Sequence, residues 1–172
     1  MNYSMRPRTG FTLVEMLVVI SILTILGGLV LTAISSARRT AKERATEATI
    51  KLLEAALMRY ETDWQDYPPS EGDGEGLRGS ENLYQYLRIE KKEGPYITSK
   101  DIQLSDVNKN GEMEIADAFN RPLLYFHHRD YANKAPNKRT FRLFSYGANG
   151  VNDDGRAGSD DLVNWNKDRP ND

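Results

Sequence analysis

The sequence predicts an α+β fold, in which the second half of a long N-terminal α-helix packs on a small antiparallel β-sheet. Three observations support this. Residues 11–34 are apolar except for one charged side chain, Glu15. Charged sequence then follows without a glycine or proline until Tyr67, so the same helix can continue. The C-terminal part has short apolar segments between loops rich in Gly, Asn and Asp, which is typical of strands and turns.

The bulk composition excludes several classes of protein. The 172 residues suffice for one domain with a core. A formal net charge of -2 gives no basic excess for binding nucleic acid. The chain has no cysteine, which excludes disulfides and thiolate metal sites. We therefore expect the fold to be held by its core and by a hard metal ion bound through oxygen.

The apolar run at residues 11–34 predicts a transmembrane helix. As a helix it would be about 36 Å long, and a hydrocarbon core is about 30 Å thick. Arg6 and Arg8 should keep the leader cytoplasmic, although Arg38 and Arg39 on the far side weaken this bias. The expected organisation is a leader at 1–10, a membrane helix at 11–34, its continuation outside the cytoplasm at 35–66 and a globular region at 67–172.

Three interpretations compete for this N-terminal segment. A secretory signal peptide could be cut near residues 33–35, but the apolar run is about twice the usual length. A plain membrane anchor leaves Gly10, Phe11 and Glu15 unexplained. In the third interpretation, a peptidase cuts after the small residue Gly10, and the new amine of Phe11 becomes a partner for Glu15 of a neighbouring subunit, because a carboxylate in an apolar run needs one. Alternatively, Glu15 lies near the interface and reaches water.

The string GFTLVEMLVVI at residues 10–20 resembles the prepilin cleavage and methylation motif of type IV pilins and pseudopilins. The resemblance implies cleavage after Gly10, N-methylation of Phe11 and a role for Glu15 in docking subunits into a filament. Many family members carry a helix-kinking proline in this segment where the chain has Thr32. Gly27-Gly28 could soften the helix instead.

The sequence predicts one helix of about fifty residues, beginning at Phe11 and stopped near Asp66 by the prolines at 68 and 69. A short helix at 81–87, capped by Ser80, and strands near 123–128 and 139–146 are also expected. Positions at three- and four-residue steps predict the apolar face of the long helix: Ala37, Ala41, Ala45, Ala48, Leu52, Leu53, Ala56, Leu57, Tyr60 and Trp64.

A first acidic loop, at residues 106–117, has the spacing of an EF-hand calcium loop, with Gly111 at position six. No clear helix flanks it and a strand follows, so the alternative is an Asn- and Gly-rich turn. The twelfth residue is Asp rather than Glu, as in dockerin-type loops. The candidate ligands are Asp106, Asn108, Asn110, Glu112 through its backbone carbonyl, Glu114 and Asp117.

A second acidic loop, at residues 145–165, contains four aspartates that repel one another unless solvent or a cation screens them. The alternative is a mobile acidic tail. The segments at 60–77, 117–125, 141–146 and 161–165 resemble the major pseudopilins of type II secretion, in which a structural calcium binds this loop. By position, the resemblance implies a ligand set of Asn149, Ser159 and Asp161, with Asp153, Asp154 or Asp160 as compensating carboxylates.

No feature of the sequence indicates an enzyme. His127 and His128 are adjacent on an expected strand, so they should point to opposite faces and make poor joint ligands. Nothing resembles a nucleophile elbow or a metal-activated water site.

We therefore expect a structural subunit of a periplasmic pseudopilus for type II protein secretion, stored in the inner membrane with its C-terminal part in the periplasm. The expected partners are copies of itself, other pseudopilins, the prepilin peptidase, the inner-membrane secretion platform and membrane lipid, and one or two calcium ions would be bound. The alternatives are a minor or adhesive type IV pilin, a membrane-anchored calcium-binding module that does not polymerise, and a secreted hydrolase.

Overall fold

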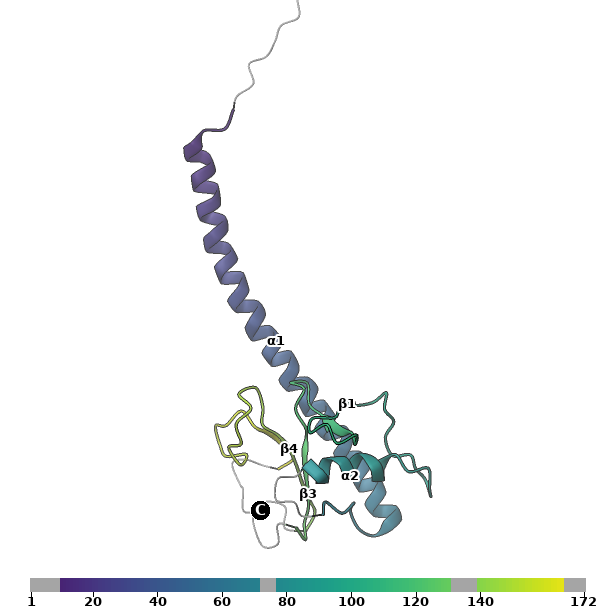
Figure 1. The fold of residues 1–172 in the computed structure, drawn as a ribbon. Helices are drawn as coiled ribbons and strands as arrows, with labels where there is room; N and C mark the ends of the chain where they lie inside the picture. The colour runs from purple at the N-terminus through teal and green to yellow at the C-terminus, as the bar shows by residue number, and fades with distance from the viewer. Residues whose placement is uncertain (1–9, 72–76, 131–138, 166–172) are drawn as a thin grey trace, which may run out of the picture. The chain divides into compact units, whose positions relative to one another are not determined.

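The computed structural model describes residues 10–71, 77–130 and 139–165 (Figure 1). The leader at residues 1–9 and part of the loop after Pro69 lie outside the described residues. The elements in chain order are α1 (Leu13–Trp64), α2 (Leu77–Leu87), β1 (Gln103–Ser105), β2 (Glu114–Ala116), β3 (Leu124–His127), β4 (Phe141–Ser145) and β5 (Leu162–Val163). The chain forms two compact units, divided within α1 after Arg39. The predicted α+β class and long helix are confirmed.

In the first unit, the large apolar side chains of α1 lie on the surface. Every large apolar side chain from Phe11 to Ile34 is exposed, from 43% at Ile34 to 81% at Leu13. The hydroxyls of Ser21 and Thr24 donate to the backbone carbonyls four residues earlier, at 2.8 and 2.7 Å, so these polar groups are satisfied inside the helix. This part of α1 is long and apolar enough to cross a membrane.

In the second unit, one face of α1 is buried at Thr46, Ile50, Leu53, Leu57 and Tyr60. The four- and three-residue steps are those of a helix face. The predicted face was right at Leu53, Ala56, Leu57 and Tyr60, and Leu52 is half-buried. It was wrong for the exposed residues Ala37, Ala41, Ala45, Ala48 and Trp64. Ile50 is buried in preference to the alanines because it buries more apolar surface. Thr46 is buried although it is polar, because its hydroxyl accepts the backbone N–H of Ala118 at 3.1 Å. Hydrophobicity alone therefore does not identify the buried face of α1.

The helix ends at Trp64, two residues before the predicted end. Gln65 takes the left-handed conformation (φ 63°), and its N–H bonds the carbonyl of Glu61 at 2.7 Å. The indole of Trp64 donates to the Tyr96 hydroxyl at 3.1 Å, and that hydroxyl donates to Asp63 at 2.5 Å. The end of α1 is thereby fixed to the segment after α2.

Two antiparallel sheets accompany the helix. β1 pairs with β2, and β4 lies between β3 and β5. The two predicted strands correspond to β3 and β4. The strands β1, β2 and β5 were not predicted, because each has three residues or fewer and therefore too little alternation to be recognised.

Helix α2 packs against β2 and β3 (Figure 1). It begins at Leu77 rather than Glu81, so Ser80 lies inside the helix and not at its cap. The buried Ser80 hydroxyl accepts the N–H of Ile115 at 3.2 Å. Gly79 permits the close approach, since a Cβ there would lie 2.0 Å from the carbonyl oxygen of Tyr125.

The hydrophobic core of the second unit lies where α1, α2 and the two sheets meet. Its side chains come from every one of these elements and from the segment between α2 and β1. It consists of Ile50, Leu53, Ala56, Leu57, Tyr60, Leu83, Leu87, Tyr96, Ile97, Ile102, Ile115, Leu123, Tyr125, Phe141 and Leu143.

Candidate functional site

The predicted cleavage site lies just outside the helix. Gly10, Phe11 and Thr12 precede α1, which begins at Leu13. Gly10 is exposed, and a Cβ there would meet nothing within 4 Å. Phe11 is 75% exposed. The fold itself therefore places no restriction on residue 10, and the bond between Gly10 and Phe11 is open to an enzyme.

Glu15 has a partner within its own chain. Its carboxylate accepts the backbone N–H of Thr12 at 2.8 Å and the Thr12 hydroxyl at 2.9 Å. The Thr12 hydroxyl in turn accepts the N–H of Glu15 at 3.2 Å. This reciprocal arrangement is a capping box, in which two N–H groups at a helix start are satisfied by side chains. The sequence pattern Thr-x-x-Glu could have indicated it, and neither prediction for Glu15 included it.

The first acidic loop connects β1 to β2. Asp106 accepts the N–H groups of Asn110 and Gly111, both at 3.1 Å. The amide oxygen of Asn108 accepts the N–H of Asn110 at 3.0 Å, and that of Asn110 accepts the N–H of Glu112 at 2.8 Å. Gly111 has φ 91°, the left-handed conformation that position six of such a loop requires. The loop is thus a hairpin connection rather than a link between two helices.

Two buried carboxylates contact this loop. Glu81 of α2 is 5% exposed, and its Oε1 accepts the side-chain amides of Asn108 and Asn110, both at 2.8 Å. Glu114, the first residue of β2, is fully buried, and its Oε2 accepts the N–H of Val107 at 2.9 Å. Sequence reasoning included Glu114 but missed Glu81, because Glu81 lies 25 residues before the loop begins.

Asp117, the expected twelfth ligand, does not contact the loop. Its Oδ1 accepts the N–H groups of Phe119 and Arg121 at 2.8 and 2.9 Å, and its Oδ2 accepts the Ser145 hydroxyl at 2.5 Å. The EF-hand spacing assumes a helix at positions nine to twelve, whereas β2 is extended. Three extended residues put about 10 Å between Glu114 and Asp117 and direct their side chains to opposite faces. Asp117 instead joins the turn after β2 to the end of β4.

In the second acidic loop, the structure brings together Asp153, Asp160 and Asp161. Each offers a carboxylate oxygen, and these atoms lie within 4.8 Å of one another. Asp161 is fully buried, and its Oδ2 accepts the N–H groups of Asp153 and Gly155 at 3.0 and 2.9 Å. The loop backbone therefore wraps around one carboxylate and directs two more towards it.

The other predicted residues of this loop lie differently. The N–H of Asn149 donates to Asp160 at 2.8 Å, and its side-chain amide reaches Asp153 at 3.5 Å. The Ser159 hydroxyl is buried. Asp154 is exposed and pairs with Arg156 at 3.5 Å, outside the carboxylate cluster. From the sequence, Asp153, Asp154 and Asp160 were alternative ligands. The structure groups Asp153 and Asp160 with Asp161 and leaves Asp154 outside the cluster.

The prediction that His127 and His128 point apart was wrong. Their ring centroids lie 4.1 Å apart, because β3 ends at His127 and strand alternation ends with it. His127 is bound on both nitrogens. Its Nδ1 accepts the N–H of Arg129 at 3.2 Å, so its Nε2 carries the proton and donates to Asp66 at 3.0 Å. Asp66 also pairs with Arg129 at 2.7 Å. Although these groups are close, a metal would have to displace existing bonds.

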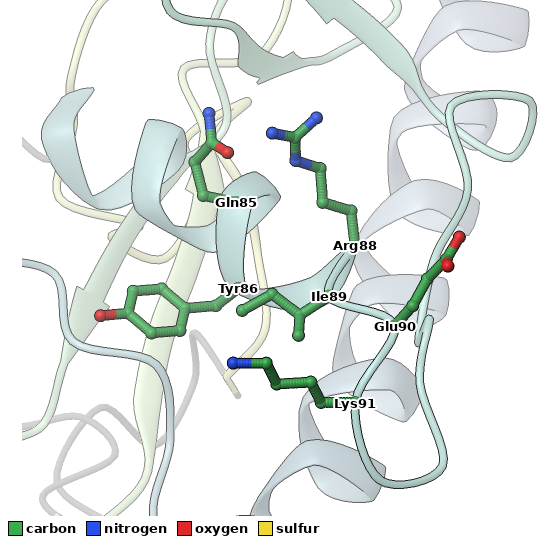
Figure 2. Close-up of a pocket in the computed structure, with 6 residues that line it drawn as sticks. All are labelled: Gln85, Tyr86, Arg88, Ile89, Glu90 and Lys91. Atoms are coloured by element: carbon green, nitrogen blue, oxygen red, sulfur yellow. The ribbon is translucent and has the colours of Figure 1, made fainter.

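A pocket beside the end of α2 offers no catalytic arrangement. It has a volume of about 560 Å³ and is lined by Gln85, Tyr86, Arg88, Ile89, Glu90 and Lys91. Figure 2 shows that these side chains point in different directions and do not converge on one point. The lining contains no nucleophile with a neighbouring base, so this pocket does not change the expectation of a non-enzymatic protein.

The N-terminal motif and the exposed apolar helix that follows it define a type IV pilin-like protein. Residues 5–31 match the family model of the prokaryotic N-terminal methylation motif. Over nearly its whole length, the chain is also similar to a particular pseudopilin of type II secretion. It is 31% identical over 166 residues to the type II secretion system core protein G of Pseudomonas aeruginosa, covering 93% of this chain and 96% of that protein.

Two further relatives match shorter parts of the chain, and one of them is also a core protein G. The core protein G of Klebsiella pneumoniae is 30% identical over 118 residues, covering 64% of this chain and 84% of that protein. The competence protein ComGC of Halalkalibacterium halodurans is 38% identical over 61 residues, covering 36% of this chain and 60% of that protein. The chain belongs to the family of type II secretion system core protein G, and it is a pseudopilin.

Proposed function

We propose that this pseudopilin is a structural subunit of a periplasmic pseudopilus that drives type II protein secretion, and that prepilin peptidase cuts it between Gly10 and Phe11. One observation carries the proposal. The methylation motif leads directly into a helix whose large apolar side chains, from Phe11 to Ile34, are all exposed. Apolar surface of this extent must be covered, first by lipid in the inner membrane and then by the same helices of other subunits.

The geometry around Gly10 supports processing at this bond. The residue lies outside α1, and a Cβ added there would meet nothing within 4 Å, so the requirement for a small side chain comes from the peptidase and not from the fold. Cleavage leaves the Phe11 amine one residue before the capping box. The carboxylate of Glu15 is then close in sequence to its own amine and can also receive that of a neighbour.

The capping box suggests how Glu15 can exist in lipid before assembly. In the stored subunit its carboxylate is bound by Thr12, so it is not left without a partner in the apolar phase. During assembly the amine of another subunit would join or replace these bonds and set the axial register. A plain membrane anchor would require the helix cap formed by Thr12 and Glu15 but not the negative charge of Glu15.

A pair of conservative variants separates the cap from the charge. Glu15→Gln keeps the acceptor that a capping box requires but cannot neutralise an amine, and Thr12→Ser keeps the capping hydroxyl as a matched control. We expect the Glu15→Gln chain to be processed and inserted like the parent but not to form filaments, whereas the Thr12→Ser chain forms them. Filament assembly is measured by cross-linking the subunits in host cells and detecting the cross-linked oligomers by immunoblot. Normal assembly of Glu15→Gln contradicts the charge-pairing role and favours an anchor.

The second acidic loop fits a structural calcium ion. Three carboxylates converge, and oxygen ligands in a flexible loop suit this hard cation. Asp153, Asp160 and Asp161 would hold it, and Ser159 and backbone carbonyls could complete the set. The ion would screen the mutual repulsion of these groups and hold the loop in one conformation.

This calcium site has a test with a matched control. Asp161→Asn removes a charge from the cluster, and Asp154→Asn removes one from the exposed pair with Arg156. We expect calcium to raise the melting temperature of the parent and of Asp154→Asn, and to have a much smaller effect on Asp161→Asn. Equal calcium effects on all three chains contradict the assignment.

A further inference from the structure

The loop between β1 and β2 has a feature that a simple turn does not need. Two buried carboxylates, from two different elements, contact it. Glu81 of α2 receives the amides of Asn108 and Asn110, and Glu114 of β2 receives the N–H of Val107. Asp106 lies at the start of the same loop, half-buried. Three carboxylates therefore border the eight residues, 106–113, that connect β1 to β2.

Glu114 carries an unsatisfied group. Its Oε1 is buried and has no hydrogen-bond partner in the described part of the chain. Among the described residues, neither Glu114 nor Glu81 forms an ion pair with a lysine or arginine. A buried carboxylate oxygen without a donor is costly, and burying a charge requires compensation. A cation bound to the loop would supply the positive charge that compensates this buried carboxylate.

We propose that this loop and Glu81 form a second divalent-cation site of the calcium class, separate from the C-terminal loop. The ligands are side-chain oxygens of Asp106, Asn108, Asn110, Glu114 and Glu81, with the backbone carbonyl of Glu112. Six oxygen donors including three carboxylates match the number and charge that calcium prefers. Glu81 takes the place that the sequence spacing gives to Asp117, whose oxygens are already bound elsewhere.

The position of Glu81 gives the site a structural consequence. Because Glu81 lies on α2 and the other ligands lie on the β1–β2 connection, one ion would join two elements that are distant in sequence. The side-chain amides of Asn108 and Asn110 already donate to the Glu81 carboxylate, so α2 is close enough to the loop for Glu81 to serve as a ligand. An ion that binds only the folded chain stabilises it in proportion to the logarithm of its concentration.

The experiment counts calcium ions on the processed full-length chain in detergent micelles, using equilibrium dialysis against calcium chloride after chelation. The test variant is Glu81→Gln combined with Glu114→Gln. Glu90→Gln combined with Glu93→Gln is the matched control, because it removes the same two charges from exposed side chains outside the loop. In an Asp161→Asn background, which lacks the C-terminal site proposed above, we expect one calcium per chain for the control and none for the test variant.

Either of two results overturns the proposal: no calcium bound in the Asp161→Asn background, or undiminished binding by the double variant. Should the double variant misfold, Asp106→Asn keeps the hydrogen-bond acceptor of the loop and should weaken calcium binding at least tenfold; unchanged affinity contradicts the site. Processing at Phe11 and the effect of Glu15→Gln on filaments do not depend on this ion. Failure of the calcium site is therefore distinguishable from failure of the pseudopilus assignment.

Discussion

Gly79→Ala tests the contact between α2 and the sheet. The added Cβ would lie 2.0 Å from the carbonyl oxygen of Tyr125 and 3.2 Å from the Cβ of Ser70. An ordinary carbon–oxygen contact is about 3.3 Å, so α2 must recede by about 1.3 Å. The strand cannot give way instead, since Tyr125 is fully buried and its hydroxyl donates to the carbonyl of Pro68 at 2.7 Å.

The expected cost follows from two opposing terms. Overpacking against backbone costs about 3 kcal/mol, the upper end of the usual range, because the clash is with a fixed atom. Alanine recovers about 1 kcal/mol as the better helix former. We therefore expect a net loss of about 2 kcal/mol in the free energy of unfolding. The displacement also moves Glu81 away from Asn108 and Asn110, so calcium binding by the first loop should weaken as well.

The assay is urea unfolding of the full chain in detergent, followed by tryptophan fluorescence. Both tryptophans lie in the second unit, where Trp64 stacks on Tyr60 and Trp165 packs on Phe144. Gly28→Ala is the matched control, because a Cβ there meets nothing within 4 Å. It should leave the unfolding of the second unit unchanged. A Gly79→Ala chain as stable as the parent, or more stable, would refute the steric argument.

Three further outcomes follow from the structure. Leu57→Ala should lower the free energy of unfolding by about 2–5 kcal/mol, whereas Met58→Ala, at an exposed neighbour, should change it little in the same urea titration. Ser145→Ala leaves an oxygen of buried Asp117 without its donor and should cost about 1–3 kcal/mol; no loss would mean that the turn does not rely on this bond. Burial, and then His127, lower the pKa of His128 below its ordinary value of about 6.5. The unfolded chain therefore binds this proton more readily, so stability should fall as the pH drops through 6.5 towards the lower folded pKa, and His128→Gln should lack this part of the fall.

Much of the helical architecture could be predicted from sequence because its signals are local. The apolar run, the absence of glycine and proline before Tyr67, and the two prolines located α1 to within two residues at each end. The start of α2 could not be found, since Gly79 and Ser80 are typical of a loop and a cap. Their place inside a helix depends on close contact with β3 and β2, which only the tertiary fold reveals.

The candidate sites were predictable only in part. Loop spacing located the first acidic loop, but assigning Asp117 to it assumed a helix where the chain forms β2. Glu81 belongs to the same place through the packing of α2, which no spacing rule contains. In the second loop, composition gave four aspartates, and the hydrogen bonds around Asp161 separate the clustered ones from Asp154. The capping box of Thr12 and Glu15 could have been predicted from the sequence, but these residues also belong to the processing motif, which was taken to explain them.

The most direct test of the account is the mature N-terminus of the protein from its own host membranes, determined by mass spectrometry. The account predicts a chain that begins at Phe11 and carries a methylated amine. A chain that begins near Ser36 would contradict it and indicate a secreted protein. An intact Met1 would contradict it equally and indicate a simple membrane anchor.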